Sequence, residues 1–264
     1  MSSPDRLLIE PRGAAEWLTL NRPDRLNAVD AGMLGELHRY LDALPDRDEV
    51  RVVVLRGAGR AFCSGLDLQE ELGGGAGSPP DAAHLLTWQR GFSQVAVKLR
   101  RIPQPVVALV AGPAVGLGFS LALAADIRIA ADSAVFSAAF IKVGFSGGDC
   151  GSSYHLPRIV GSSVAREILM TGRPCDAARA FRIGLVSAVV ADPDLERAGQ
   201  AMVDDLLAAS PTGLRLTKDL LNASEAGMSL EDVVAIEDRN QMYCLLTGDP
   251  AERIKASKWA GKKK

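Results

Sequence analysis

Two runs of apolar, mostly β-branched residues constrain the fold of this chain more than any other feature. They lie at residues 50–55, where Arg51 is the single polar residue, and at 106–110, and a long helical pattern at 81–101 lies between them. A continuous apolar run is typical of a strand buried on both faces, as in a parallel sheet covered by helices. Strand and helix patterns alternate over the first two thirds of the chain, and helical patterns dominate the last third. We therefore expect an α/β core followed by a helical C-terminal region.

Shorter patterns indicate the remaining elements. Asp30 is a good cap for a helix over Ala31–Ala43, because its side-chain oxygen can accept from a free N–H group of the first turn. Residues 72–80 hold a run of glycine and proline that suits no regular element, so we expect a mobile loop there. Further strands are expected at 7–9, 16–20, 127–130, 134–136 and 185–190. Further helices are expected at 162–170, 176–181, 193–209, 211–223, 229–246 and 250–256.

The composition argues against several classes of function. The formal net charge is −2, with 30 Lys and Arg against 32 Asp and Glu, whereas nucleic-acid binders normally carry a basic excess. No apolar stretch reaches the ~20 residues that span a bilayer, and the N-terminal segment does not resemble a signal peptide. The four cysteines and three histidines lack metal-ligand spacing. We expect a cytoplasmic protein that binds no metal, nucleic acid or membrane.

A glycine-containing turn follows each buried strand and leads into a helix. The turns cover 62–67 and 112–118. Glycine lets the backbone approach a ligand closely, and the first N–H groups of a helix have no partner inside it. Two such turns side by side would offer two donors to one developing oxyanion. From the glycines alone, however, plain tight connections are the preferred interpretation.

Five motifs, in this order, resemble the crotonase (enoyl-CoA hydratase/isomerase) superfamily. They are NRPDRLNA, VVVLRGAGRAFCSGLDL, DIRIAADSAVF, LPRIVG and TGRPCDAARAFRIGLVSAVV. The resemblance implies a spiral core of ββα turns in residues 1–192 and a helical trimerisation region in residues 193–264. It implies homotrimers, often paired into hexamers. It also implies an acyl-CoA thioester substrate of the kind used in fatty acid metabolism, with no cofactor beyond the coenzyme A of the substrate.

The same resemblance assigns roles to the two turns. The backbone N–H groups of Leu66 and Leu117 would form the oxyanion hole for the thioester oxygen. Coenzyme A would lie against Arg25, Ser64 and Asp67. For Arg25, a solvated loop charge is an equally good interpretation. For Asp67, a structural role is favoured, in which its carboxylate bonds nearby N–H groups.

The sequence departs from the hydratase pattern at both catalytic acids. Hydratases use two carboxylates around a water, and the corresponding positions here hold Ser120 and Phe140. We expect these two residues in the substrate pocket, together with Trp88. Because neither replacement is an acid, hydration by the route that uses two glutamates is not expected.

Asp149 is an acid close to this pocket. It falls where dienoyl-CoA isomerases and 4-chlorobenzoyl-CoA dehalogenase, two relatives in the superfamily, carry a functional aspartate. Asp149 could act as a single base that moves a proton while the oxyanion hole holds the enolate. Alternatively, it caps the helix that begins near Ser152. The dehalogenase also needs a histidine, and the corresponding position here is Ser93.

The sequence therefore predicts an acyl-CoA enzyme of the hydratase/isomerase family, with proton transfer of the isomerase type favoured over hydration. Two alternatives stay open. One is a protein that binds CoA esters without catalysis. The other is an aryl-CoA hydrolase or dehalogenase that uses Asp149 as its nucleophile.

Overall fold

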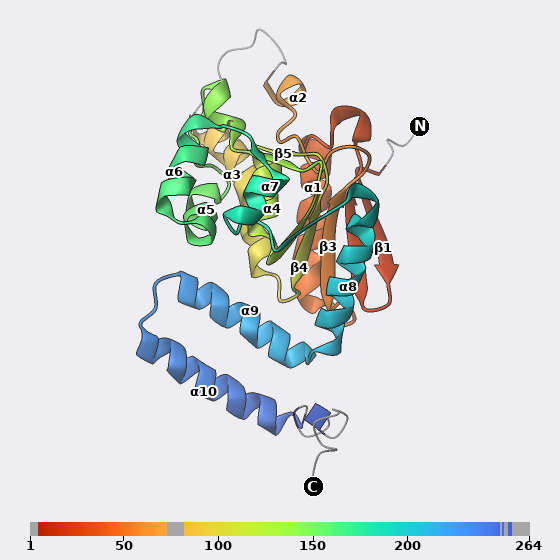
Figure 1. The fold of residues 1–264 in the computed structure, drawn as a ribbon, viewed down its shortest axis with the longest axis vertical. Coiled ribbons are helices and arrows are strands. Elements are labelled where there is room, and N and C mark those ends of the chain that lie inside the picture. Colours follow the sequence, from red (N-terminus) through yellow and green to blue (C-terminus); the bar gives the residue numbers. More distant parts are fainter. Residues whose placement is uncertain (1–4, 73–81, 249, 251–252, 255–264) are drawn as a thin grey trace. The chain divides into compact units, whose positions relative to one another are not determined.

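The computed structural model describes residues 5–72, 82–248, 250, 253 and 254 (Figure 1). The chain divides into two compact units, residues 1–204 and 205–264. This boundary lies inside helix α8 (Leu195–Ala208), whose first part packs on the sheet, whereas the boundary expected from the sequence follows residue 192. A β-carbon on Gly199 would lie only 2.5 Å from Cδ1 of Leu109 in the sheet.

Within the described residues of the first unit, six strands form the main sheet in the order β1-β2-β3-β4-β6-β9. The first two pair antiparallel, and the other neighbours pair parallel. The strands are β1 (Leu7–Arg12), β2 (Ala15–Leu20), β3 (Val52–Gly57), β4 (Val106–Val110), β6 (Ile127–Ala131) and β9 (Ala188–Val190). All of β2 and β4 and most of β3 are buried, so the interpretation of the continuous apolar runs is confirmed.

A smaller sheet, three-stranded in the described residues, stands beside the main one. Its strands are β5 (Pro113–Val115), β7 (Val135–Ser137) and β8 (Cys175–Asp176). The chain passes from β4 into β5 and then into helix α4 (Leu117–Ala124), which makes one ββα turn of the predicted spiral. The glycine turns predicted from the sequence therefore lie where the chain leaves one sheet for the other.

Helices cover the sheets. Asp30 caps α1 as predicted, since Oδ1 of its carboxylate accepts from the N–H group of Met33 at 2.8 Å. The helices of this unit, besides α4 and α8, are α1 (Ala31–Ala43), α2 (Leu68–Leu72), α3 (Ala82–Arg101), α5 (Ser152–Val160), α6 (Ser162–Thr171) and α7 (Ala177–Arg182). Short 3₁₀ helices are η1 (Pro23–Arg25), η2 (Leu44–Asp46), η3 (Ala139–Val143) and η4 (Asp192–Asp194).

Helix α4 is buried on every side. Its C-terminal carbonyl groups accept hydrogen bonds from the guanidinium of Arg128, which reaches the oxygen of Ala125 at 2.6 Å. A cation at the C-terminal end of a helix is favourable because that end carries partial negative charge. The opposite, positive end of α4 begins at Leu117, in the second glycine turn.

The second unit contains α9 (Pro211–Glu225) and α10 (Leu230–Leu246), which pack against each other as a helical hairpin (Figure 1). Ser210 and Ser229 cap them. The predicted loop at 72–80 and the predicted helix at 250–256 lie almost entirely outside the described residues. No helix in the described ranges combines the length and the apolar character that crossing a bilayer requires.

His155 on α5 gives the fold a testable dependence on pH. Its side chain is buried, and burial together with the charges of Arg100, Arg128 and Arg158 lowers its pKa from 6.5 to about 4. The unfolded chain therefore binds more protons than the folded one between these pH values. It follows that stability is lost as the pH falls through this window.

We predict that the free energy of unfolding falls by about 2 kcal/mol between pH 7 and pH 5 because of this one group. Denaturant unfolding at the two pH values measures the change. A His155→Gln variant should lose most of it, whereas a variant of the exposed His84, His84→Gln, should keep it. An equal pH dependence in wild type and His155→Gln would contradict the assignment.

Candidate active site

Backbone hydrogen bonds hold the two glycine turns side by side. The N–H group of Cys63 donates to the oxygen of Pro113 at 3.0 Å, and the N–H group of Val115 donates to the oxygen of Cys63 at 2.9 Å. A β-carbon on Gly65 would lie 3.5 Å from the nitrogen of Leu117. The two turns are therefore adjacent, as they must be if their N–H groups are to donate to one oxygen.

Leu66 and Leu117 carry N–H groups that donate to no protein acceptor in the part of the chain that the structure describes. Leu117 is the first residue of α4, where helix geometry leaves the N–H group unpaired. The residues on either side of Leu66 bond to Val29: the oxygen of Gly65 accepts from the N–H group of Val29, and the N–H group of Asp67 donates to the oxygen of Val29. Because N–H groups alternate in direction along an extended chain, that of Leu66 points away from Val29.

A cavity of about 220 Å³ lies against these two N–H groups. Leu66 and Leu117 line it, and most of its wall is apolar. Four aromatic side chains contribute to the wall: Trp88, Phe92, Phe140 and Phe145. Trp88 and Phe92 pack edge to face with ring centroids 5.1 Å apart. Trp88 and Phe140 thus lie in the cavity wall, where the sequence analysis expected the substrate pocket.

Asp149 lines the same cavity, and its side chain does not cap a helix. Helix α5 begins after Gly151, which provides no side-chain cap. The carboxylate oxygen Oδ1 instead accepts hydrogen bonds from Nε2 of Gln89 and from the N–H group of Cys150, both at 2.7 Å. The Asp149 carboxylate thus makes no capping hydrogen bond to α5, and Asp149 is one of the residues that line the cavity.

Ser120 is not among the residues that line the cavity, which corrects its predicted position. It is fully buried on α4, and its hydroxyl donates to the backbone oxygen of Asp149 at 3.0 Å. Because α4 is enclosed by protein on all sides, this side chain meets the loop before α5 and not the open space. Ser120 thus supports the backbone of Asp149 from behind.

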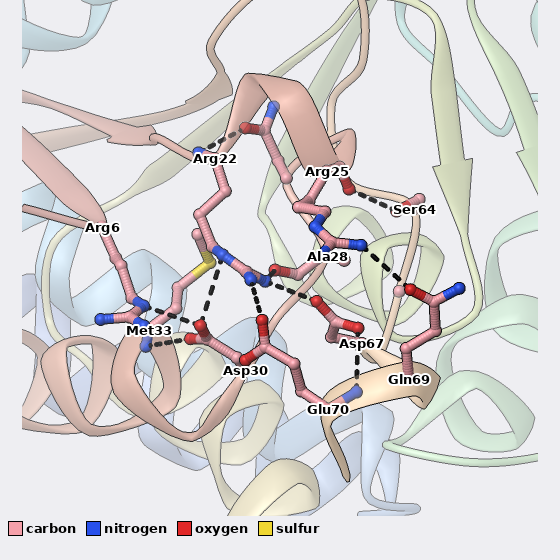
Figure 2. A network of polar contacts seen from close by, with 12 residues as sticks. Arg6, Arg22, Arg25, Ala28, Asp30, Met33, Ser64, Asp67, Gln69 and Glu70 are labelled. Carbon is pink, nitrogen blue, oxygen red and sulfur yellow. Dashed lines mark hydrogen bonds and ion pairs between the residues drawn. The ribbon is translucent and has the colours of Figure 1, made fainter. Parts of the chain in front are cut away.

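The residues expected to bind coenzyme A separate into two groups. Ser64 lines the cavity, and its hydroxyl donates to the backbone oxygen of the exposed Arg25 at 3.3 Å (Figure 2). Asp67 is buried and is not among the residues that line the cavity, and its carboxylate accepts from Arg22 and from the N–H group of Glu70. Its contact with coenzyme A stays a prediction. Burial acts to raise the pKa of its carboxyl, but hydrogen bonds from Arg22 and the Glu70 amide outweigh burial and leave the pKa below its ordinary value.

Arg22 received no role from the sequence, yet it fixes the first turn in place (Figure 2). Its guanidinium donates to the oxygen of Ala28 at 2.7 Å, to Asp67 at 3.0 Å and to Glu70 at 2.7 Å, and it forms an ion pair with Asp30 at 3.3 Å. One side chain thus connects residues 28–30 with residues 67–70, which directly follow Leu66 in the chain. The motif NRPDRLNA contains Arg22, but nothing local distinguishes it from a solvated arginine.

Two thiols next to the site are poor nucleophiles. Burial raises the pKa of the Cys63 thiol to about 12. Burial also raises the pKa of Cys150, and the charge of Asp149 raises it further. Both remain protonated near neutral pH, and only thiolates are effective nucleophiles.

Among the described residues that line the cavity, Asp149 is the only carboxylate, and no histidine lines it. The described residues also hold no group of three or more His, Cys, Asp or Glu side chains placed to bind a metal ion. The arrangement can stabilise negative charge on an oxygen held by two N–H groups. It can also move a proton with one carboxylate.

We predict that Arg22→Met lowers the free energy of unfolding by about 3 kcal/mol, because it leaves the buried Asp67 without its ion-pair partner. Denaturant unfolding measures the change. The matched variant Arg25→Met removes an exposed arginine whose guanidinium donates to Gln69, and it should cost less than about 0.5 kcal/mol. Equal losses in the two variants would contradict the role given to Arg22.

Comparisons with known proteins agree with this geometry. The family model described as "Enoyl-CoA hydratase/isomerase" matches residues 12–256. A probable enoyl-CoA hydratase of Mycobacterium bovis is 41% identical over 263 residues, which covers 97% of this chain and 90% of that protein. The 1,2-epoxyphenylacetyl-CoA isomerase of Escherichia coli K12 is 34% identical over 239 residues, with 90% of each chain covered.

Solved structures show the same fold. A Streptomyces coelicolor A3(2) structure assigned to the enoyl-CoA hydratases superposes with a TM-score of 0.91 at 37% identity, covering 100% of this chain and 94% of that one. A Thermobifida fusca YX structure, assigned likewise and solved in complex with CoA, gives a TM-score of 0.84 at 35% identity, covering 92% and 94%. The chain therefore belongs to the enoyl-CoA hydratase/isomerase family, within the crotonase superfamily.

Proposed function

We propose that this protein is an acyl-CoA isomerase in which Asp149 moves a proton along the acyl group. The observation that carries the proposal is the presence of one carboxylate, that of Asp149, among the described residues of a largely apolar cavity. The N–H groups of Leu66 and Leu117 lie against the same cavity and have no protein acceptor among the described residues. A base and an oxyanion hole are together sufficient for proton transfer next to a thioester.

The reaction then runs in two proton-transfer steps. The Asp149 carboxylate removes a proton from an acyl carbon, and the electron pair of that C–H bond moves toward the thioester oxygen. The N–H groups of Leu66 and Leu117 stabilise the resulting enolate oxygen. The protonated Asp149 then returns the proton to a different carbon, which shifts the double bond. Substrate and product are isomers, so the step consumes no water and needs no cofactor beyond the coenzyme A of the substrate.

Coenzyme A binding is part of this proposal. The relative from Thermobifida fusca was solved with CoA, and Ser64 and Arg25 adjoin the cavity here. We infer that the Arg25 guanidinium, exposed and held by one hydrogen bond to Gln69, attracts the phosphates of the ligand. A positive charge at the entrance of a site raises the local concentration of an anionic ligand.

Hydration is the second candidate, because several relatives are named as hydratases. It requires acid and base groups to activate water and to protonate carbon. The described cavity wall offers Phe140 at one of the two expected acid positions, and Ser120 at the other is buried behind the wall. These positions favour isomerisation, as does the isomerase of Escherichia coli among the relatives.

Two further alternatives are less well supported. Hydrolysis through an ester on Asp149 needs a base to activate water, and the described lining residues include no histidine. A binding protein without catalysis would have no need for a carboxylate facing an apolar cavity, where burial of a charged group costs free energy.

The second unit supports a proposal about assembly. Large apolar side chains are exposed on α9 and α10, among them Leu221, Leu230, Leu245 and Leu246. Apolar surface of this kind is typical of subunit contacts. We propose that the protein forms homotrimers, which can pair into hexamers. Light scattering at micromolar concentration should give three or six times the mass of one chain, and a monomer would contradict the proposal.

We predict that Asp149→Asn abolishes deuterium incorporation into the acyl group while the variant still binds the ester. The purified protein is incubated in deuterated water with a panel of enoyl-, dienoyl- and aryl-CoA esters, and mass spectrometry follows each ester. The wild type should incorporate deuterium without net gain of water and without loss of the thioester. Hydration of crotonyl-CoA that survives Asp149→Asn would overturn the proposal, as would binding without any turnover in the wild type.

A further inference from the structure

Gln89 makes the closest side-chain contact to the proposed base. It lies on α3, sixty residues before Asp149 in the sequence, and its Nε2 atom donates to Oδ1 of Asp149 at 2.7 Å. A carboxylate can only accept in such a bond, so the amide nitrogen faces it. Both residues line the cavity, and the bond therefore lies in the wall of the proposed active site.

The two oxygens of the Asp149 carboxylate have different surroundings. Oδ1 accepts from Gln89 and from the N–H group of Cys150, both at 2.7 Å. In the part of the chain that the structure describes, no N–H or hydroxyl group donates to Oδ2. Oδ2 is therefore the oxygen that these two hydrogen bonds leave available to a bound acyl group.

The backbone of Asp149 is also held on both sides. Its oxygen accepts from the hydroxyl of Ser120 at 3.0 Å, and its N–H group donates to the hydroxyl of Ser152 at 3.0 Å. These bonds fix the backbone. Rotation of the side chain about χ1 and χ2 is restrained by the N–H group of Cys150, the next residue in the chain, and by the amide of Gln89, which reaches Oδ1 from a separate helix.

Gln89 itself lies on a helix that packs against the core. It precedes Phe92, Ala96 and Leu99 at helical spacing, and these three side chains are buried. A polar residue that continues the apolar face of a helix is held in place by the packing of its neighbours. The amide group can therefore set the orientation of the carboxylate, since it is held by the packing of α3 and not by the loop that carries Asp149.

We propose that Gln89 is a positioning residue that holds Oδ1 of Asp149, so that Oδ2 is the oxygen that removes and returns the proton. The inference rests on the proposed function, since it concerns the same base. The proton travels from carbon to Oδ2 and from Oδ2 to another carbon, and Oδ1 stays bonded to Gln89 throughout. Gln89 touches no reacting atom in this scheme and acts only through Asp149.

Three variants test the inference in the deuterium-exchange assay. Gln89→Leu keeps a similar volume and removes the donor. Gln89→Glu replaces the amide by a carboxyl, which can donate to Asp149 only while it is protonated. Gln94→Leu, on an exposed position of the same helix, serves as the matched control. Thermal unfolding of each variant shows whether it is folded under the assay conditions.

We expect Gln89→Leu to lower kcat by about 10- to 100-fold, with KM changed by less than about threefold, because the base is misaligned while binding is kept. Gln89→Glu should retain activity at acidic pH and lose it as the pH rises, because two ionised carboxylates cannot share one hydrogen bond. The wild type and Gln94→Leu should not show this loss. Among the described lining residues, Cys150 is the other titratable neighbour of Asp149, and it is present in all variants.

The outcomes separate this inference from the proposed function. If Asp149→Asn abolishes exchange but Gln89→Leu keeps kcat within twofold of wild type, the positioning role is wrong and the isomerase proposal stands. A pH profile of Gln89→Glu that matches the wild type would also overturn it. If Asp149→Asn leaves exchange unchanged, the proposed function fails, and the role of Gln89 fails with it.

Discussion

The hydrogen bonds between Cys63 and the segment Pro113–Val115 are the constraint on which the rest of the site depends. They bring two strand-to-helix turns, about fifty residues apart in sequence, into contact. The contact is so close that a β-carbon on Gly118 would lie 2.1 Å from the oxygen of Cys63. Other interactions hold each of the two turns in place. Arg22 holds the first turn, and the burial of α4 with Arg128 at its C-terminal end holds the second. Donors fixed in this way need no reorganisation when charge develops on a bound oxygen.

Sequence patterns predicted the architecture well because local physics determines it. Continuous apolar runs became buried parallel strands, and Asp30 capped the helix that it precedes. The family resemblance led to Leu66, Leu117 and Asp149. Leu66 lies within one of the five quoted motifs, whereas Leu117 and Asp149 lie between them. Sequence could not show that Ser120 faces the backbone of Asp149, or that Gln89 reaches its carboxylate. Both contacts join segments distant in the chain, and their directions depend on how helices pack. The one local signal for Gln89 is a polar side chain on the apolar face of α3.

The cavity combines few polar groups with many apolar ones. In such surroundings an electrostatic interaction is stronger than in water, because the effective dielectric constant is lower. Two N–H groups and one carboxylate, held in place by the contacts described above, would thus have a large influence on a bound ester. The thiols of Cys63 and Cys150 add bulk without charge, since their raised pKa keeps them protonated. The positions of the two N–H groups and the carboxylate therefore matter more for the chemistry of the site than the number of polar groups.

The carboxylate of Asp30 serves two structures at once. One oxygen caps α1 by accepting from the N–H group of Met33, and the other forms ion pairs with Arg6 and Arg22. Arg22 also donates to Asp67, the residue after Leu66 (Figure 2). Fraying at the start of α1 would therefore remove an anchor from the turn at residues 62–67. Formation of α1 and the order of this turn are thus coupled, so a local opening that costs less free energy than global unfolding would disturb both.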